Sequence, residues 1–224
     1  MEEGETERMR IADGKTLVMI GDSITDCERK RPYGEGLFSG TGKGYVALVE
    51  ALLQSKYPER RIRIINMGIS GNTVRDLKAR WASDVEELRP DWVSIMIGIN
   101  DVWRQFDMPA IRSAHVYLEE YEETLNELVA RTKPKTEGIV LMMPFYIEPN
   151  REDPMRAEMD RYGAAVKRIA QKHGTLLVDT QAAIDALTVH LYPAAIAWDR
   201  VHPNLTGHMA IARAFLDAVG FEWN

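Results

Sequence analysis

Apolar residues along the chain occur in five short runs, at residues 17–20, 62–66, 92–97, 139–143 and 175–179. Runs of this length are typical of buried strands in a parallel sheet. Between them lie stretches in which apolar residues recur with the helical period, and the clearest comprise Tyr45, Leu48, Val49, Leu52 and Leu53, then Val116, Tyr117, Tyr121, Leu125, Leu128 and Val129, then Ala210, Ile211, Ala214, Phe215 and Val219. The alternation predicts right-handed crossovers in a three-layer α/β/α sandwich with a five-stranded parallel sheet, and we expect residues 1–224 to form one domain.

The first apolar run ends at a glycine, and a serine follows two residues later. Gly21 permits a tight turn that would leave Ser23 at the carboxyl end of the strand, where open α/β sheets bind their ligands. A serine in that position can act as a nucleophile. Asp22 and Ser23 are also favoured helix N-caps, so this segment alone fits a capped strand-to-helix turn equally well.

Near the other end of the chain, Asp199 and His202 are three residues apart, so one short loop can carry both side chains. A serine hydroxyl needs a base to take its proton, and the base needs a carboxylate that fixes its tautomer and stabilises its charged form. Pro203 disfavours helical backbone at His202 and would hold the imidazole in the loop. Alone, this spacing would indicate an ordinary surface loop; together with Ser23 it indicates a catalytic acid–base pair.

Two further segments follow apolar runs and carry hydrogen-bond donors. Gly71 lies beyond the run at 62–66, and Asn100 lies beyond the run at 92–97. Acyl transfer needs donors aimed at the oxyanion, and a glycine N–H and an asparagine amide both fit that role. Each residue alone would also fit a simpler role, Gly71 in a turn and Asn100 as a helix cap. Four such segments at four strand ends favour a hydrolytic site.

The four segments read GDSIT, SGNT, GIND and DRVHPN, and together they resemble the SGNH hydrolases, also called GDSL esterases. The stretches GISGNTVRDLKARW, PDWVSIMIGINDVWRQ and YPAAIAWDRVHP are most similar to the intracellular bacterial acetylxylan esterases of this superfamily. The resemblance implies a flavodoxin-like strand order 2-1-3-4-5. It also implies Ser23 as nucleophile, His202 as base, Asp199 as its partner, and an oxyanion hole formed by the Ser23 N–H, the Gly71 N–H and the Asn100 side chain.

We therefore expect a serine esterase that removes acetyl groups from sugar hydroxyls, such as those of acetylated xylo-oligosaccharides, through an acyl-enzyme. Trp103 and Trp198 could stack on a sugar ring, although core packing would explain each equally well. We also expect Asp22 to contact the substrate. Short-chain lipolytic esterases and thioesterases share all four motifs and remain alternatives.

Two other classes fit parts of the sequence. An aspartyl phosphatase would use Asp22 and Mg²⁺, but it needs a second acid at the position of Ile24. A non-catalytic flavodoxin-like binding module would leave Asp199 and His202 unexplained. The histidines lack metal-ligand spacing, and we expect neither a metal nor another cofactor.

Composition and charge limit the cellular locations and the binding partners that we expect. A net charge of −6 without a basic run argues against nucleic acid, and no apolar stretch approaches the roughly 20 residues of a membrane span. The acidic start at residues 1–5 does not look like a signal peptide, and the one cysteine, Cys27, cannot form an intramolecular disulfide. We expect a cytoplasmic homo-oligomer that does not bind membranes, in which Cys27 is a half-buried thiol with no histidine or lysine beside it.

Overall fold

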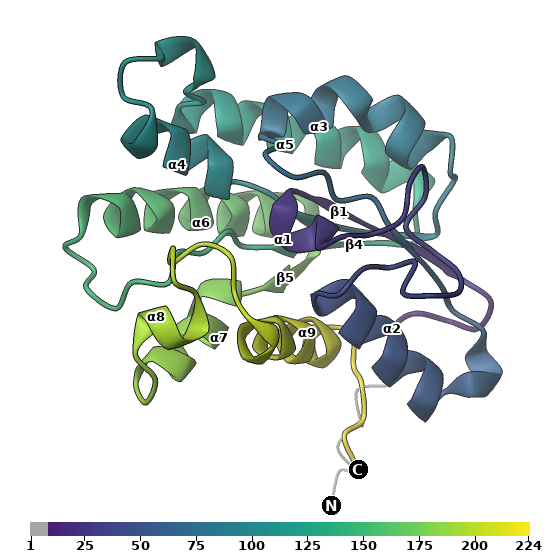
Figure 1. Ribbon diagram of the computed structural model, residues 1–224. Coiled ribbons are helices and arrows are strands. Elements are labelled where there is room, and N and C mark those ends of the chain that lie inside the picture. The colour runs from purple at the N-terminus through teal and green to yellow at the C-terminus, as the bar shows by residue number, and fades with distance from the viewer. Residues whose placement is uncertain (1–8) are drawn as a thin grey trace, which may run out of the picture.

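Five parallel strands form the sheet at the centre of the molecule (Figure 1). The computed structural model describes residues 9–224, so the acidic segment at residues 1–5 lies outside the described residues. The strands are β1 (Thr16–Gly21), β2 (Arg63–Asn66), β3 (Trp92–Met96), β4 (Gly138–Met142) and β5 (Leu176–Val178). Their order is β2-β1-β3-β4-β5, which confirms the expected fold. The single-domain organisation stays a prediction.

Helices cover both faces of the sheet, as Figure 1 shows. One layer contains α3 (Val74–Trp81), α4 (Ile99–Asp107), α5 (Leu118–Thr132) and α6 (Pro154–His173), and the other contains α2 (Tyr45–Lys56), α7 (Thr180–Thr188), α8 (Pro193–Ile196) and α9 (Leu205–Ala218). The short α1 (Ser23–Asp26) follows β1 directly. Shorter helical turns are η1 (Pro58–Arg60), η2 (Ala82–Glu86), η3 (Arg112–Ala114) and η4 (Lys133–Lys135).

The predicted helical stretches correspond to α2, α5 and α9, with one correction at Tyr117. Tyr121, Leu125 and Leu128 are buried against the sheet, as their spacing predicts. Tyr117 is 50% exposed, because it precedes the first residue of α5 and occupies the extended N-cap position. A side chain at that position is not on the helical face that the periodicity defines.

Side-chain caps determine where the helices next to the strand ends begin. Asp22 caps α1 by accepting the N–H of Ile24. Thr73 and Asp76 form a capping box at the start of α3, and Asn204 accepts two N–H groups at the start of α9. Each cap replaces a hydrogen bond that the first turn of a helix lacks. The polar residues that lead into these helices are thereby held at the carboxyl edge of the sheet.

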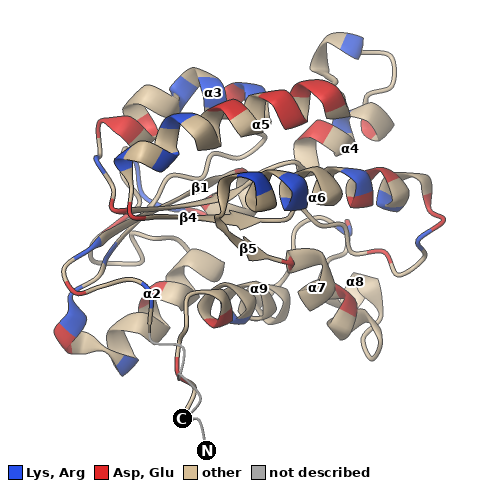
Figure 2. Cartoon of the chain, turned by 180° about the vertical axis from the view of Figure 1, so that it is seen from behind, with Lys and Arg blue, Asp and Glu red and all other residues tan. Residues whose placement is uncertain are grey.

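Charged residues on the outer layers are largely paired with the opposite sign. Figure 2 shows acidic residues along α5 beside basic residues on α6, and Arg168 binds both carboxylate oxygens of Glu122 across that boundary. Within the described residues, no helix has the length and apolar character that crossing a membrane requires.

Candidate active site

Ser23, His202 and Asp199 form one hydrogen-bonded line. The Oγ of Ser23 lies 2.8 Å from Nε2 of His202, and Nδ1 of His202 lies 2.6 Å from Oδ2 of Asp199. Ser23 is the first residue of α1, and His202 belongs to the loop before α9. Both distances fit a nucleophile, a base and an orienting acid. The structure thus brings together three residues that the sequence singled out.

The conformation of the Asp199–His202 loop is held by the same carboxylate. Oδ1 of Asp199 accepts the N–H groups of Val201 and His202 at 3.0 and 2.9 Å. Burial alone would raise the pKa of Asp199, but the hydrogen bonds from the His202 ring and from these two N–H groups hold it below its usual value. Asp199 is therefore a carboxylate that accepts a hydrogen bond from Nδ1–H of His202. The lone pair on Nε2 is then left facing the hydroxyl of Ser23.

Asp22 does not lie where a substrate could reach it. Its side chain is 1% exposed and caps α1 through the N–H of Ile24. Burial raises its pKa to about 7, although the hydrogen bond to Ile24 and the charges of His202 and Arg80 lower it. This placement argues against the expected substrate contact and assigns Asp22 the capping role instead.

Gly71 lies in the loop between β2 and α3, with a backbone angle φ of +83°. A Cβ atom there would meet nothing within 4 Å, so the residue faces open space, and the positive φ favours glycine. The preceding residue is held by Asp26, whose Oδ2 accepts the N–H of Ser70 at 3.1 Å and its hydroxyl at 3.0 Å. The loop that carries the Gly71 N–H is therefore fixed.

The amide of Asn100 has one defined orientation. Its Nδ2 donates to the carbonyl of Asn72 at 3.0 Å, and its Oδ1 accepts from Arg104 at 3.3 Å. The side chain is 2% exposed and lies in the first turn of α4. One Nδ2–H remains beyond the bond to Asn72, and Asn72 follows Gly71 in the chain. The two oxyanion donors predicted from separate motifs thus belong to one connected arrangement.

The turn from β3 into α4 depends on Gly98, which has a φ of +135°. A Cβ atom at this position would lie 2.8 Å from the ring of Pro144. Only glycine fits both the backbone angle and the close approach. Gly98 therefore permits the turn that places Asn100 at the end of β3.

The two tryptophans occupy different surroundings. Trp103 packs partly against the core, and its ring meets the His202 ring edge-on at 5.9 Å between centroids. Its surface continues into a shallow groove of about 300 Å³, lined also by Phe106, Asp107, Tyr146, Asp153, Pro154 and Met155. Trp198 is 85% exposed, so core packing does not explain it.

The sequence did not predict the contact between Cys27 and His208. Cys27 is half-buried as expected, but its Sγ lies 3.6 Å from Nε2 of His208 on α9, which corrects the expectation of no histidine beside it. Burial lowers the pKa of His208 to about 4, and its Nδ1 accepts the N–H of Tyr45. Across residues 9–224, His, Cys, Asp and Glu side chains do not gather into a group that could hold a metal ion.

Residues 19–210 match the model of the GDSL-like lipase/acylhydrolase family. The chain belongs to this family. It is 63% identical over 215 residues to an acetylxylan esterase of Geobacillus stearothermophilus, covering 96% of this chain and 98% of the relative.

Solved structures agree with this family membership. The crystal structure of Axe2, an acetylxylan esterase from the same organism, has a TM-score of 0.95 at 63% identity, covering 96% of this chain and 98% of that chain. Other Axe2 structures are described as catalytic mutants, in which a serine, an aspartate or a histidine is replaced. An alpha/beta hydrolase enzyme from the metagenome of Lake Arreo, Spain, has a TM-score of 0.94 at 59% identity, covering 95% of this chain and 98% of that chain.

Proposed function

We propose that this GDSL-family protein is a serine esterase that removes acetyl groups from the hydroxyls of xylo-oligosaccharides or related sugars. The hydrogen-bonded line of Ser23, His202 and Asp199 carries the proposal. The acetylxylan esterase relatives support the substrate class. The residues replaced in the catalytic mutants of Axe2 are spaced along that chain as these three are along this one.

The reaction begins when Ser23 Oγ attacks the acetyl carbon and its proton passes to Nε2 of His202. The new C–O bond produces a tetrahedral intermediate. This collapses by breaking the bond to the sugar oxygen, which takes the proton from His202 and leaves as a hydroxyl. Water then attacks the acetyl-enzyme while His202 accepts its proton, and acetate departs as Ser23 recovers its proton. Asp199 holds the ring in the required tautomer and stabilises its charged form.

The negative oxygen of the intermediate needs donors that are in place before the reaction. The N–H groups of Ser23 and Gly71 and the second Nδ2–H of Asn100 are the donors we assign to it. Asn100 is held by Asn72 and Arg104 before substrate binds, so little reorganisation is needed during the reaction.

The chemistry places the leaving sugar on one side of the site. His202 must reach the leaving oxygen in order to protonate it, so the sugar lies on the side of His202 and away from Asn100. The Trp103 ring contacts the His202 ring and continues into the groove with Phe106. Aromatic faces suit sugar rings, and Asp107 and Asp153 in the groove can accept hydrogen bonds from hydroxyls.

The test compares two substrate panels. We expect acetate release from acetylated xylo-oligosaccharides, and we expect nitrophenyl acetate to be cleaved faster than the butyrate and octanoate esters. The Trp103→Ala variant should lose more kcat/KM on sugar acetates than on nitrophenyl acetate, because the small leaving group does not need the aromatic surface. A preference for octanoate with no action on sugar acetates would replace this proposal by a lipid esterase or thioesterase.

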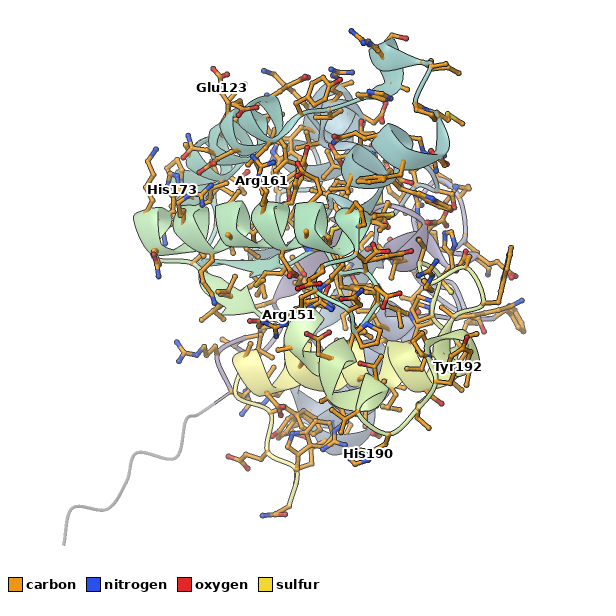
Figure 3. The ribbon with its side chains drawn as sticks, turned by 90° about the vertical axis from the view of Figure 1, so that its left-hand side faces the viewer. Glu123, Arg151, Arg161, His173, His190 and Tyr192 are labelled. Carbon is orange, nitrogen blue, oxygen red and sulfur yellow. The ribbon has the colours of Figure 1, made fainter. Side chains whose placement is uncertain are left out.

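We also propose that the chain forms a homo-oligomer through apolar side chains next to the His202 loop. Tyr192, Trp198 and Leu205 are 77%, 85% and 61% exposed, and Figure 3 shows Tyr192 at the surface. Asn204 binds the carbonyls of Ala195 and Ile196, which brings the start of α9 against α8. Exposed apolar surface of this kind is typical of interfaces.

The cytoplasmic location stays a prediction.

Sedimentation velocity at several concentrations tests the oligomer. The wild-type chain should sediment as a species larger than its 25.5 kDa monomer, and Leu205→Asp should shift it toward the monomer. Leu37→Asp, at an exposed leucine between α1 and α2, is the matched control and should leave the oligomer intact. A wild-type chain that sediments as a monomer at every concentration would contradict the proposal.

A further inference from the structure

One arginine behind the site binds several loops at once. Arg80 lies near the end of α3 with a side chain that is 12% exposed. Its Nε donates to Oδ1 of Asn72 at 2.7 Å, and its Nη2 donates to the carbonyl of Gly21 at 2.9 Å. Its Nη1 donates to the carbonyl of Met67 at 2.7 Å and to Asp84 at 2.6 Å. Four of the five N–H groups of this guanidinium are thus used on four separate acceptors.

Three of these acceptors belong to the segments that carry the oxyanion donors. Gly21 ends β1, two residues before Ser23. Asn72 follows Gly71 directly, and the carbonyl of Asn72 accepts the side-chain amide of Asn100. Arg80 therefore contacts the Ser23 and Gly71 segments directly and the Asn100 side chain through one intervening residue.

We propose that Arg80 is a positioning residue for the oxyanion hole, setting the relative placement of the Ser23, Gly71 and Asn100 donors through Gly21, Met67 and Asn72. The proposal rests on the proposed esterase function, because it assigns Arg80 a part in the same transition state. Its ion pair with Asp84, a residue of η2, is a further contact of the same guanidinium and involves none of the three loops.

A lysine at position 80 could not make the same set of loop contacts. A guanidinium is planar and presents its donors in fixed directions, whereas an ammonium is a compact charge on a flexible stem. The three loop acceptors of Arg80 are each reached by a different nitrogen of one guanidinium: Nε binds Asn72, Nη1 binds Met67 and Nη2 binds Gly21. An ammonium at the same place would keep the charge but lose most of the loop contacts. Arg80→Lys therefore separates the geometry from the charge.

Kinetics with nitrophenyl acetate provide the main test, because this substrate reports on the oxyanion hole independently of sugar binding. We expect Arg80→Lys to lower kcat by about 10- to 100-fold while KM changes by less than about twofold, since small misplacements in the site act mainly on the transition state. The pH midpoint of kcat should not move, because Arg80 makes no hydrogen bond to the Ser23–His202–Asp199 line. A kcat within twofold of wild type would overturn the proposal.

Two controls separate positioning from general stabilisation. Asp84→Asn removes the ion pair but leaves the three loop contacts, and it should keep kcat near wild type. Arg131→Lys alters an arginine that pairs with Glu86 on the surface, and it should have no effect on kcat. If Asp84→Asn lowers kcat as much as Arg80→Lys does, the ion pair is the cause and the positioning role is wrong.

A second variant keeps the proposal testable if Arg80→Lys does not fold. Asn72→Ala removes only the side-chain acceptor of Arg80, while its backbone carbonyl can still hold Asn100. This variant should also lower kcat without raising KM, and a kcat within twofold of wild type would overturn the proposal. Where Arg80→Lys does fold, combining the two variants should cost less than the sum of the two single effects. Strict additivity would overturn the proposal. Failure of the esterase function would look different, because the wild-type protein itself would then not hydrolyse nitrophenyl acetate.

Discussion

The carboxylate of Asp199 holds His202 at two points: Oδ2 lies 2.6 Å from Nδ1 of the ring, and Oδ1 accepts the His202 N–H at 2.9 Å. One side chain thus fixes both the backbone of the loop and the tautomer of the imidazole. These two roles can be separated experimentally, because an amide can replace one of them but not the other.

We expect Asp199→Asn to lower kcat/KM by about 10³- to 10⁴-fold with little loss of stability, since the amide oxygen can still accept the loop N–H groups but the ring loses its carboxylate. Hydrolysis of nitrophenyl acetate and thermal unfolding measure the two effects. Asp13→Asn, at an exposed aspartate, is the control. Wild-type activity in Asp199→Asn would remove Asp199 from the site.

Ser23→Ala should abolish almost all activity, by about 10⁴- to 10⁶-fold, because the nucleophile is lost. The fold should be retained, since the Ser23 side chain is half-buried and its hydroxyl bonds to His202. Acetate release and the unfolding temperature are the measurements. Ser83→Ala, at an exposed serine on η2, should behave as wild type. An active Ser23→Ala enzyme would exclude the serine mechanism.

The Asn100→Ala variant should lower kcat by about 10²- to 10³-fold and change KM much less, as expected for a donor used mainly in the transition state. Steady-state kinetics with nitrophenyl acetate separate the two constants. If only KM rises, Asn100 contacts the bound substrate and does not stabilise the oxyanion.

Removal of metal ions should leave the rate unchanged, because the proposed reaction uses only protein side chains. Dialysis against a chelator followed by assay, with and without added Mg²⁺ or Zn²⁺, measures this. Activity that is lost and then restored by a metal would favour the phosphatase-like alternative, in which Asp22 would be the nucleophile.

The buried carboxyl of Asp101 should make the free energy of unfolding depend on pH. It is fully buried, and burial raises its pKa to about 7 from 3.8, against hydrogen bonds such as that from the Val74 N–H. Because the folded-state pKa is raised, its contribution to stability is full below about pH 4 and is lost as the pH rises through 7.

The Asp101→Asn variant has no such proton to lose. Its free energy of unfolding, relative to wild type, should therefore increase between pH 4 and pH 7, by up to about 1.4 kcal/mol per pH unit. Urea unfolding at several pH values measures the difference, with Asp13→Asn as the control. A difference that stays constant across this range would show that Asp101 does not titrate as described.

The sequence predicted the elements whose signal is local. The apolar run at 17–20 corresponds to β1, Thr16–Gly21, and the run at 175–179 to β5, Leu176–Val178. A hydrophobic run bounded by glycine or polar residues is sufficient for such a prediction. The strand order required the family resemblance, because periodicity contains no information about which strands are neighbours.

The residues behind the site could not be predicted in this way. Arg75 and Arg80 are both arginines on α3, yet one pairs with Glu120 on the surface and the other binds the loops. Only the packing of α3 on the sheet decides which of them faces inward. Cys27 and His208 meet although they are 181 residues apart in the chain. Contacts of this kind depend on the tertiary fold and leave no local pattern.

The turn at Gly98 affects how a mutational scan of this protein should be interpreted. Its φ of +135° and the nearby ring of Pro144 exclude any larger side chain, so every substitution would displace the segment that carries Asn100. Such a scan would rank Gly98 beside Ser23 and His202, although it has no side chain to offer to the chemistry. Sensitivity to substitution in this enzyme therefore identifies the residues that shape the site together with those that react in it.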